Sequence, residues 1–163
     1  VLDFARPSTP HFELTDITAP LRDALRLSHV TQRKAGISVV TDLQEGLPPV
    51  YIDKHQMEQV IMNLITNAAE SLSGSAGERR IDLQTYADQD SVVIRCADSG
   101  CGIRPESREK IFDPFYTTKK DGSGIGLSIC ERIIADHRGS ISVGSSPSGG
   151  AEFIIRIPRG SKG

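Results

Sequence analysis

The spacing of apolar residues predicts three helices. The first follows a cap at Asp16 or Thr18 and ends at Gly36, and its apolar positions are Leu21, Ala24, Leu25, Leu27 and Val30. The second and longest spans 53–72 and is capped by Asp53. Its buried positions are Met57, Val60, Ile61, Leu64, Ile65 and Ala68. The third spans about 124–137.

Alternation of apolar and polar residues predicts the strands. The clearest pair covers 81–86 and 91–97, joined by a turn at 87–90. Shorter extended segments are expected at 11–14, 37–40 and 50–52, and a final hairpin joins 140–143 to 152–157 through Gly149 and Gly150. This proportion of elements predicts an α+β fold, a two-layer α/β sandwich whose mixed, mostly antiparallel sheet is covered on one face by helices.

Length and charge narrow the class of protein. The 163 residues, with a mass of 17.7 kDa, fit one domain with its own apolar core. A net charge of −2, from 19 basic and 21 acidic residues, offers no electrostatic footprint for nucleic acid or anionic lipid. We therefore expect no nucleic-acid partner and no direct membrane contact by this domain.

The cysteines and histidines suggest no metal centre. Cys96, Cys101 and Cys130 form no CxxC pair, which disfavours a disulfide framework and a zinc site. We expect these thiols to serve in packing, in a reducing cytoplasm, with Cys101 the most open to another role. Surface or cap positions are expected for the histidines, His11, His29, His55 and His137. The chain contains no GxxxxGK[ST] phosphate loop, and no GxGxxG follows a first strand.

Two amides lie on one face of the predicted long helix. Asn63 and Asn67 are four residues apart, so their side chains can point at the same spot. An asparagine carbonyl oxygen is a hard ligand suited to Mg²⁺, which takes few protein ligands and keeps waters and phosphate oxygens. The alternative is a pair of solvated or capping amides.

A carboxylate at a strand end is the second candidate. Asp98 ends a buried strand and is followed at once by Gly100 and Gly102. A carboxylate here can accept a hydrogen bond from an exocyclic amine, and the glycines let a flat ring approach the backbone closely. An ordinary Asp-Ser-Gly turn is the alternative.

Glycines at the start of the predicted third helix favour a bound anion. Gly122, Gly124 and Gly126 lead into that helix, where free N–H groups and the helix dipole attract phosphate, although such a pattern is often only a turn. They follow a segment without periodicity, 99–121, and loops of that length are usually functional. The hydroxyl and ammonium groups of 116–120 could meet a phosphate tail, or form a solvated charged loop.

Four stretches, NLITNA at 63–68, DSGCG at 98–102, FDPF at 112–115 and GSGIG at 122–126, occur in a fixed order. Together they resemble the N, G1, F and G2 boxes of the ATP-binding catalytic domain of sensor histidine kinases, within the gyrase, Hsp90, histidine kinase and MutL superfamily. The FARP segment at 4–7 is similar to the end of the second dimerisation helix in kinases of the nitrogen-regulator and dicarboxylate-sensor types. The resemblance implies a protein-histidine kinase of a two-component system that binds Mg-ATP and donates the γ-phosphate to a histidine on a separate dimerisation and phosphoacceptor domain.

The resemblance also implies residue roles. Asp98 would bind the adenine amine, Asn67 would hold Mg²⁺, and Asn63 and Lys119 would act in catalysis beside the phosphates. The implied nucleotide contacts are Asn63, Asn67, Asp98, Gly100, Gly102, Ile103, Thr117, Thr118, Lys119, Gly122, Ser123, Gly124, Ile125, Gly126 and Leu127.

A division of the chain follows from the same resemblance. Residues 1–10 would hold the end of an upstream dimerisation helix and a linker, 11–158 the catalytic domain with an ATP lid at about 100–122, and 159–163 a tail. No histidine here is followed by a carboxylate and a proline, so the phosphoacceptor is expected upstream. A response regulator would be reached through the full-length kinase, which is cytoplasmic or has this domain as its cytoplasmic part.

One position separates the branches of the superfamily. ATPases of the gyrase and Hsp90 kind carry a glutamate four residues before the magnesium asparagine, because a carboxylate can polarise an attacking water. Asn63 occupies that position and is no base, which favours phosphoryl transfer to an already nucleophilic imidazole. Ser99 and Glu70 depart from the family pattern, in which an asparagine and a basic residue are usual.

Other interpretations stay open at this point. A hydrolytic ATPase of the gyrase or Hsp90 kind is the nearest rival, and Asn63 argues against it. A degenerate, non-catalytic interaction module that kept the fold is the second, and the intact glycines at 100, 102, 122, 124 and 126 argue against that. A redox sensor acting through Cys101 is the third.

Overall fold

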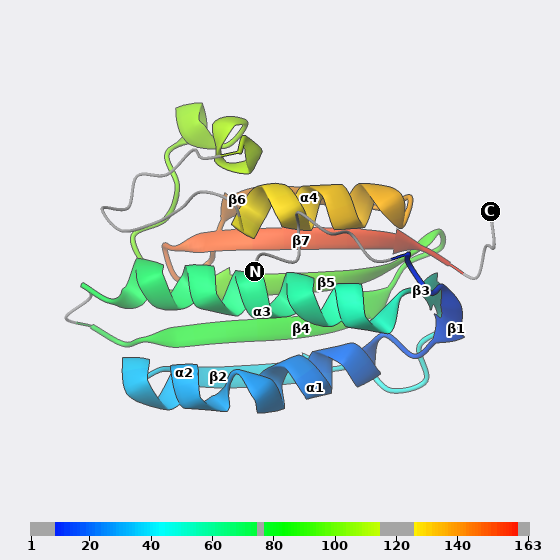
Figure 1. The fold of residues 1–163 in the computed structure, drawn as a ribbon. Helices are drawn as coiled ribbons and strands as arrows, with labels where there is room; N and C mark the ends of the chain where they lie inside the picture. The colour runs from blue at the N-terminus through cyan, green and yellow to red at the C-terminus, as the bar shows by residue number, and fades with distance from the viewer. Residues whose placement is uncertain (1–8, 75–76, 115–125, 160–163) are drawn as a thin grey trace.

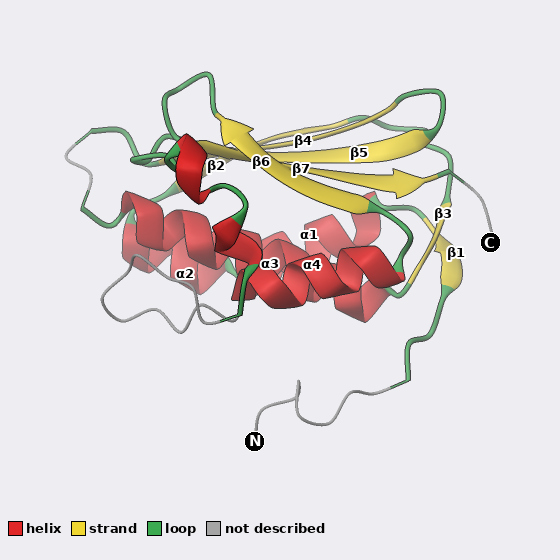
Figure 2. Cartoon of the chain, turned by 90° about the horizontal axis from the view of Figure 1, so that it is seen from above, coloured by secondary structure: helices red, strands yellow, loops and turns green. Residues whose placement is uncertain are grey.

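Strands and helices form two separate layers in the computed structural model, which describes residues 9–74, 77–114 and 126–159. A twisted sheet forms one layer and the helices lie against one of its faces (Figures 1 and 2). In chain order the elements are β1 Glu13–Thr15, α1 Thr18–Leu27, α2 His29–Ala35, β2 Ser38–Leu43, β3 Val50–Ile52, α3 Lys54–Leu72, β4 Arg80–Ala87, β5 Ser91–Asp98, α4 Gly126–Asp136, β6 Ser140–Ser145 and β7 Ala151–Pro158.

The main sheet has five strands in the order β2-β4-β5-β7-β6. Only β2 and β4 pair in parallel, and the other neighbours are antiparallel, so the sheet is mixed and mostly antiparallel as predicted. A separate two-stranded sheet joins β1 to β3. The predicted α+β sandwich is therefore confirmed.

Helix α3 follows its sequence pattern closely. Asp53 is the N-cap, and its Oδ1 accepts a hydrogen bond from the backbone N–H of Gln56 at 3.0 Å. All six predicted inward positions are buried, together with Ala69 and Leu72. Burying an apolar stripe of this length against the sheet is what fixes the rotation of the helix and so directs Asn63 and Asn67 away from the core.

The first predicted helix is instead two helices, α1 and α2, which meet at Ser28. Ser28 is buried, its hydroxyl donates to the carbonyl of Leu25, and the Gln32 amide donates to that same carbonyl. These side-chain bonds compete with the helical pattern and end α1 there. Leu27 and Val30, which the single-helix pattern placed on the buried side, are 57% and 60% exposed. Gly36 ends α2 with a left-handed φ of 66°.

The segment after β5 is described as far as residue 114. Two short 3₁₀ helices, Pro105–Ser107 and Lys110–Phe112, lie in it, and Ile111 and Phe112 are buried in the core. The Phe112 ring meets Phe153 of β7 edge to face, with centroids 6.3 Å apart. Hence the first half of the expected lid is anchored to the domain, whereas residues 115–125 lie outside the described residues.

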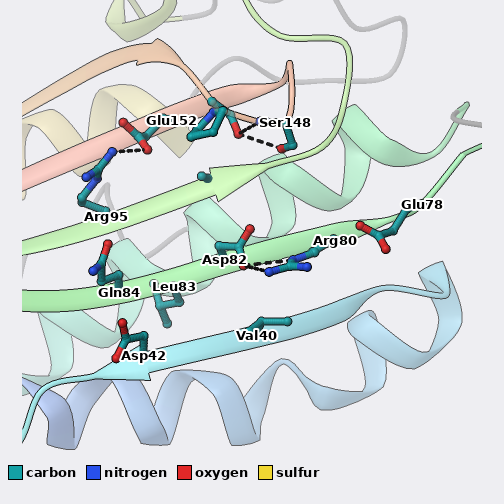
Figure 3. A pocket seen from close by; sticks show the side chains of 13 residues that line it. Val40, Asp42, Glu78, Arg80, Asp82, Leu83, Gln84, Arg95, Ser148 and Glu152 are labelled. Carbon is teal, nitrogen blue, oxygen red and sulfur yellow. Dashed lines mark hydrogen bonds and ion pairs between the residues drawn. The ribbon is translucent and has the colours of Figure 1, made fainter.

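The other face of the main sheet carries a hollow of about 610 Å³ lined mainly by outward side chains of β2, β4, β5 and β7 (Figure 3). Two ion pairs lie among its lining residues. Arg80 lies 2.8 Å from Asp82, and Arg95 lies 2.6 Å from Glu152. Since these charges neutralise each other in pairs, the hollow is a weaker candidate for an anionic ligand than the opposite side of the sheet.

Cysteines and histidines mostly take the positions expected of them. Cys96 and Cys130 are buried, Cys101 is exposed, and His11, His29 and His55 are exposed. His137 is different, because it is 4% exposed and lies inside the domain at the end of α4. None of the helices in the described part of the chain has the length and apolar character that a membrane span requires.

Candidate functional site

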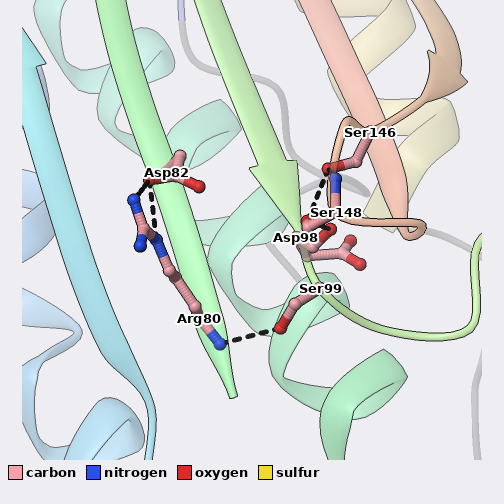
Figure 4. A network of polar contacts seen from close by, with 6 residues as sticks. All are labelled: Arg80, Asp82, Asp98, Ser99, Ser146 and Ser148. Atoms are coloured by element: carbon pink, nitrogen blue, oxygen red, sulfur yellow. Dashed lines mark hydrogen bonds and ion pairs between the residues drawn. The ribbon is translucent and has the colours of Figure 1, made fainter. Parts of the chain in front are cut away.

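The candidate site lies at the end of the main sheet where β5 finishes. Asp98 is the last residue of β5, and the turn before β7 lies beside it (Figure 4). Helix α3 crosses the inner face of the sheet and carries Asn63 and Asn67, and α4 begins at Gly126 next to Asn63. The structure therefore joins Asn63 of the first motif to Gly126 of the last, and brings Cys101 of the second motif to Ser71 near the end of α3.

Asp98 is held by backbone donors on both sides. It is 3% exposed, and its Oδ1 accepts hydrogen bonds from the N–H of Gly100 at 2.8 Å and of Ala151 at 3.3 Å. The first bond closes the turn after β5, and the second comes from the adjacent strand. These two backbone donors hold the Asp98 carboxylate in a defined orientation at the end of the strand.

Two glycines are required by the packing around this carboxylate. A Cβ on Gly150 would collide with the carbonyl and carboxylate oxygens of Asp98 and would lie 2.7 Å from the backbone N of Gly100. A Cβ on Gly100 would collide with Ser71 of α3. Packing inside the protein thus favours glycine at position 100, in addition to the close approach of a flat ring that the sequence suggested. Gly102 has a left-handed φ of 75°, which a side chain would disfavour.

Three serines fix the backbone near Asp98 (Figure 4). The Ser148 hydroxyl donates to the Asp98 carbonyl at 3.1 Å and lies 2.8 Å from the Ser146 hydroxyl. Ser99 accepts from the backbone N–H of Arg80 at 3.0 Å and donates to the Glu78 carbonyl at 2.8 Å. Ser99, which stands where the family usually has an asparagine, therefore ties the start of β4 to the end of β5.

Asn63 lies at the contact of α3 with α4, and Asn67 lies one helical turn further along α3. Asn63 and Asn67 are both half-buried, and the Asn63 amide donates to the Gly126 carbonyl at 3.4 Å. Burial raises the pKa of the neighbouring Cys130 thiol to about 12, with a hydrogen bond from Asn63 opposing it. Burial raises the pKa of Cys96 likewise to about 12, with help from the charge of Asp98. Both thiols are therefore protonated packing groups.

Leu127 and Ile103 are half-buried and pack against the core. The other predicted contacts, Thr117, Thr118, Lys119, Gly122, Ser123, Gly124 and Ile125, lie outside the described residues. Sequence reasoning missed Gly150, Ala151 and Ser148, which it had read only as parts of the last hairpin. The available signal was the pair Gly149-Gly150 at the start of a strand expected to lie in the same sheet as β5.

The donor set allows one protein ligand for a divalent cation. No group of three or more His, Cys, Asp or Glu side chains suited to a metal occurs among residues 9–74, 77–114 and 126–159. A cation that binds mainly through phosphate oxygens and water fits this arrangement, since it needs only one amide oxygen from the protein. Asn67, on the same face of α3 as Asn63, can supply that oxygen.

Comparison with known proteins assigns the class. Residues 52–161 match the family model of the histidine kinase-, DNA gyrase B- and HSP90-like ATPases, and the chain belongs to this family. It has the catalytic ATPase domain of the histidine-kinase branch. Since the family is one of ATPases, the domain is a nucleotide-binding domain.

Individual relatives agree with this assignment. The chain is 34% identical over its whole length to the signal transduction histidine-protein kinase AtoS of Escherichia coli, and it covers 26% of AtoS. It is 31% identical to the C4-dicarboxylate transport sensor protein DctS of Rhodobacter capsulatus, in an alignment that covers 97% of this chain and 24% of DctS. It thus spans about a quarter of the length of these relatives. The catalytic domain of histidine kinase ThkA superposes with a TM-score of 0.79 at 31% identity, over 91% of this chain and 98% of that domain.

Proposed function

We propose that this domain binds Mg-ATP and donates the γ-phosphate to a histidine on a separate helical dimerisation domain of a sensor histidine kinase. The observation that carries the proposal is the Asp98 carboxylate, fixed by two backbone donors at the strand end beside the helix that bears Asn63 and Asn67. A carboxylate in a fixed plane can distinguish an exocyclic amine from an oxygen, because only the amine donates. This selects adenine over guanine at that edge.

Phosphates would lie toward α4. The helix begins at Gly126, and its first N–H groups and dipole favour anionic oxygens. Gly122, Ser123, Gly124, Ile125 and Leu127 would contribute backbone or flanking contacts, and Thr117, Thr118 and Lys119 would meet the phosphates from the lid at about 100–122. Gly100, Gly102 and Ile103 would contact the base at the opposite end of the nucleotide.

Mg²⁺ would be held by the Asn67 carbonyl oxygen. When bound, the ion neutralises charge on the phosphate oxygens. Asn63 has no basic atom and already donates to Gly126, so its role would be to orient the phosphate end. Catalysis would then consist of positioning together with charge stabilisation, to which Lys119 contributes.

The nucleophile and the downstream partner would lie elsewhere in a longer kinase. A structure of ThkA in complex with the response regulator protein TrrA resembles this chain over 96% of its residues, with 28% identity and a TM-score of 0.80. That likeness supports a response regulator as the eventual phosphate acceptor. We assign residues 1–10 to an upstream helix and linker, 11–158 to the catalytic domain and 159–163 to a tail, in a protein that presents this domain to the cytoplasm.

Substitution of Asn67 tests the metal assignment. In Asn67→Ala, calorimetric titration with ADP should give the same affinity with Mg²⁺ as with a chelator, whereas the unaltered chain should bind more tightly with Mg²⁺. Asn67 is half-buried and lies outside the apolar stripe of α3, and alanine is a good helix former, so the helix should tolerate the change. Persistence of the full magnesium effect in the variant would remove Asn67 as the ligand.

Transfer and hydrolysis are separated by following the γ-phosphate. With labelled ATP and a separate helical domain carrying a phosphoacceptor histidine, label should appear on that domain in an acid-labile form. Without that domain the chain should release little free phosphate. Rapid release of phosphate by the isolated chain would favour the hydrolytic ATPase instead.

A further inference from the structure

His137 joins two helices through its two ring nitrogens. Its Nδ1 lies 2.7 Å from the carbonyl oxygen of Ile133 in α4, and its Nε2 lies 3.0 Å from the backbone nitrogen of Asp53, the N-cap of α3. A carbonyl can only accept and a backbone N–H can only donate, so Nδ1 must carry the proton and Nε2 must be bare. These contacts therefore select the neutral ring in its Nδ1–H tautomer.

A third segment of the chain reaches the same ring. Phe12 packs against His137 with ring centroids 4.8 Å apart, and it stacks on Tyr51 of β3 at 5.7 Å. The preceding residue, His11, donates its backbone N–H to Asp53 Oδ2 at 2.7 Å. The segment before β1, the start of α3 and the end of α4 thus meet around one imidazole.

Charge on the ring would break this junction. Protonation places an N–H on Nε2, where it would face the N–H of Asp53, and two donors cannot bond to each other. Burial lowers the pKa of His137, while the Ile133 carbonyl and the carboxylates of Asp53 and Asp136 act in the opposite direction. The ionisable residues within two positions of Phe12, Asp53 or His137 are His11, Glu13, Tyr51, Asp53, Lys54, His55, Asp136 and Arg138.

The junction lies at the opposite end of α4 from the candidate site. Helix α4 has 11 residues, so about 16 Å of helix separates its two ends. Along that length α3 and α4 pack on each other, and near the site they meet where Asn63 donates to Gly126 at 3.4 Å. A rigid helix released at one end changes its angle to its neighbour, and the separation of Asn63 and Gly126 changes with it.

We infer that His137 is a positioning residue whose neutral ring joins the His11–Phe12 segment to both helices and so sets the separation of Asn63 and Gly126 at the nucleotide site. The inference rests on the proposed function and extends it. Nucleotide affinity becomes dependent on the protonation of a side chain that does not touch the nucleotide. Through the same junction, a movement of the segment before β1 would also change the separation of Asn63 and Gly126.

The inference is tested first by the pH dependence of ADP affinity. In the unaltered chain, affinity should fall by about twofold to thirtyfold more than in His137→Gln when the pH is lowered from about 7.5 to about 5.5. The glutamine carbonyl can accept from Asp53 at every pH, and titration of ADP itself is common to both proteins. His55→Gln, an identical change at an exposed position on α3, should keep the full fall of the unaltered chain.

A second measurement needs no variant. Nitrogen NMR of the imidazoles in the unaltered chain should show His137 as the Nδ1–H tautomer, with a pKa below the ordinary value of a histidine. Because coupling is reciprocal, saturating ADP should lower the pKa of His137 further. A pKa that ADP leaves unchanged, an Nε2–H tautomer, or an equal fall in affinity in His137→Gln would each overturn the inference.

Failure of the proposed function has a different outcome. If the unaltered, folded chain bound no ADP at any pH, the proposed function would be lost, and with it the coupling, while the tautomer would still be decided by NMR.

Discussion

Asp53 and Asp98 are both buried carboxylates that accept hydrogen bonds from two backbone amides, yet their surroundings differ. One oxygen of Asp53 accepts the N–H of Gln56 and the other accepts the N–H of His11, and the backbone N–H of Asp53 donates to the His137 ring. Asp98 receives both donors on Oδ1 and is enclosed by glycine backbone, where no side chain fits. Burial and satisfied bonds are therefore common to a structural carboxylate and a candidate binding carboxylate, and the glycines mark the difference.

The largest effect is expected where a side chain is added beside Asp98. Gly150→Ala should lower the free energy of unfolding by about 3 kcal/mol, because the new Cβ meets backbone atoms that cannot move aside cheaply. Chemical denaturation measures this. Gly74→Ala is the matched control, since no atom lies within 4 Å of a Cβ there, and it should change stability by less than about 0.5 kcal/mol. Equal stability of the two variants would contradict the close packing around Asp98.

Exchange of the carboxylate for an amide should affect binding more than folding. Asp98→Asn keeps an acceptor for Gly100 and Ala151 but places an NH₂ group where an acceptor is needed for the adenine amine. We expect a loss of about 2 kcal/mol in ADP binding, roughly thirtyfold, in titration calorimetry. Affinity equal to that of the unaltered chain would refute the adenine contact.

The same substitution at Asp53 should affect folding more than nucleotide binding. Asparagine remains a good N-cap for α3, so only the bond from His11 is lost, and stability should fall by about 1 kcal/mol. The backbone N–H that Asp53 gives to His137 is unaltered, so ADP affinity should stay within about twofold. A large loss of ADP affinity without loss of stability would show that Asp53 also acts in binding, and would contradict the distinction drawn between Asp53 and Asp98.

The smallest expected effect concerns the reactivity of the thiols near Asp98. Cys101 is exposed in the glycine turn, whereas Cys96, two residues before Asp98, is buried and has a pKa raised to about 12. A thiol reagent should therefore label the folded chain at Cys101 alone, and all three cysteines only after unfolding. Labelling of Cys96 in the folded chain would mean that the end of β5 opens readily.

The sequence predicted the elements that depend on local pattern and missed those that depend on distant contacts. Asp53 as a cap and the buried face of α3 follow from residues within a few positions of each other. The break at Ser28 does not, because serine is a weak helix breaker and its effect there comes from being buried. His137 was expected at the surface or a cap, since its partner Asp53 lies 84 positions away and no local signal joins them.

The site was predictable to a similar extent. Asp98, Asn63 and Asn67 stand out through spacing and neighbours, and the structure brings Asn63 to Gly126 as the motif order suggested. Gly150 and Ala151 approach Asp98 because β7 pairs with β5, a pairing that the sequence pattern did not specify. The contacts expected from 117–125 stay predictions.

Calorimetric titration of the unaltered chain with ADP in the presence of Mg²⁺ tests the central claim most directly. The account predicts saturable heat with one nucleotide per chain, weaker binding after chelation of Mg²⁺, and a higher melting temperature in the complex. Neither heat nor a shift in melting temperature from a well-folded sample at saturating ADP would contradict it.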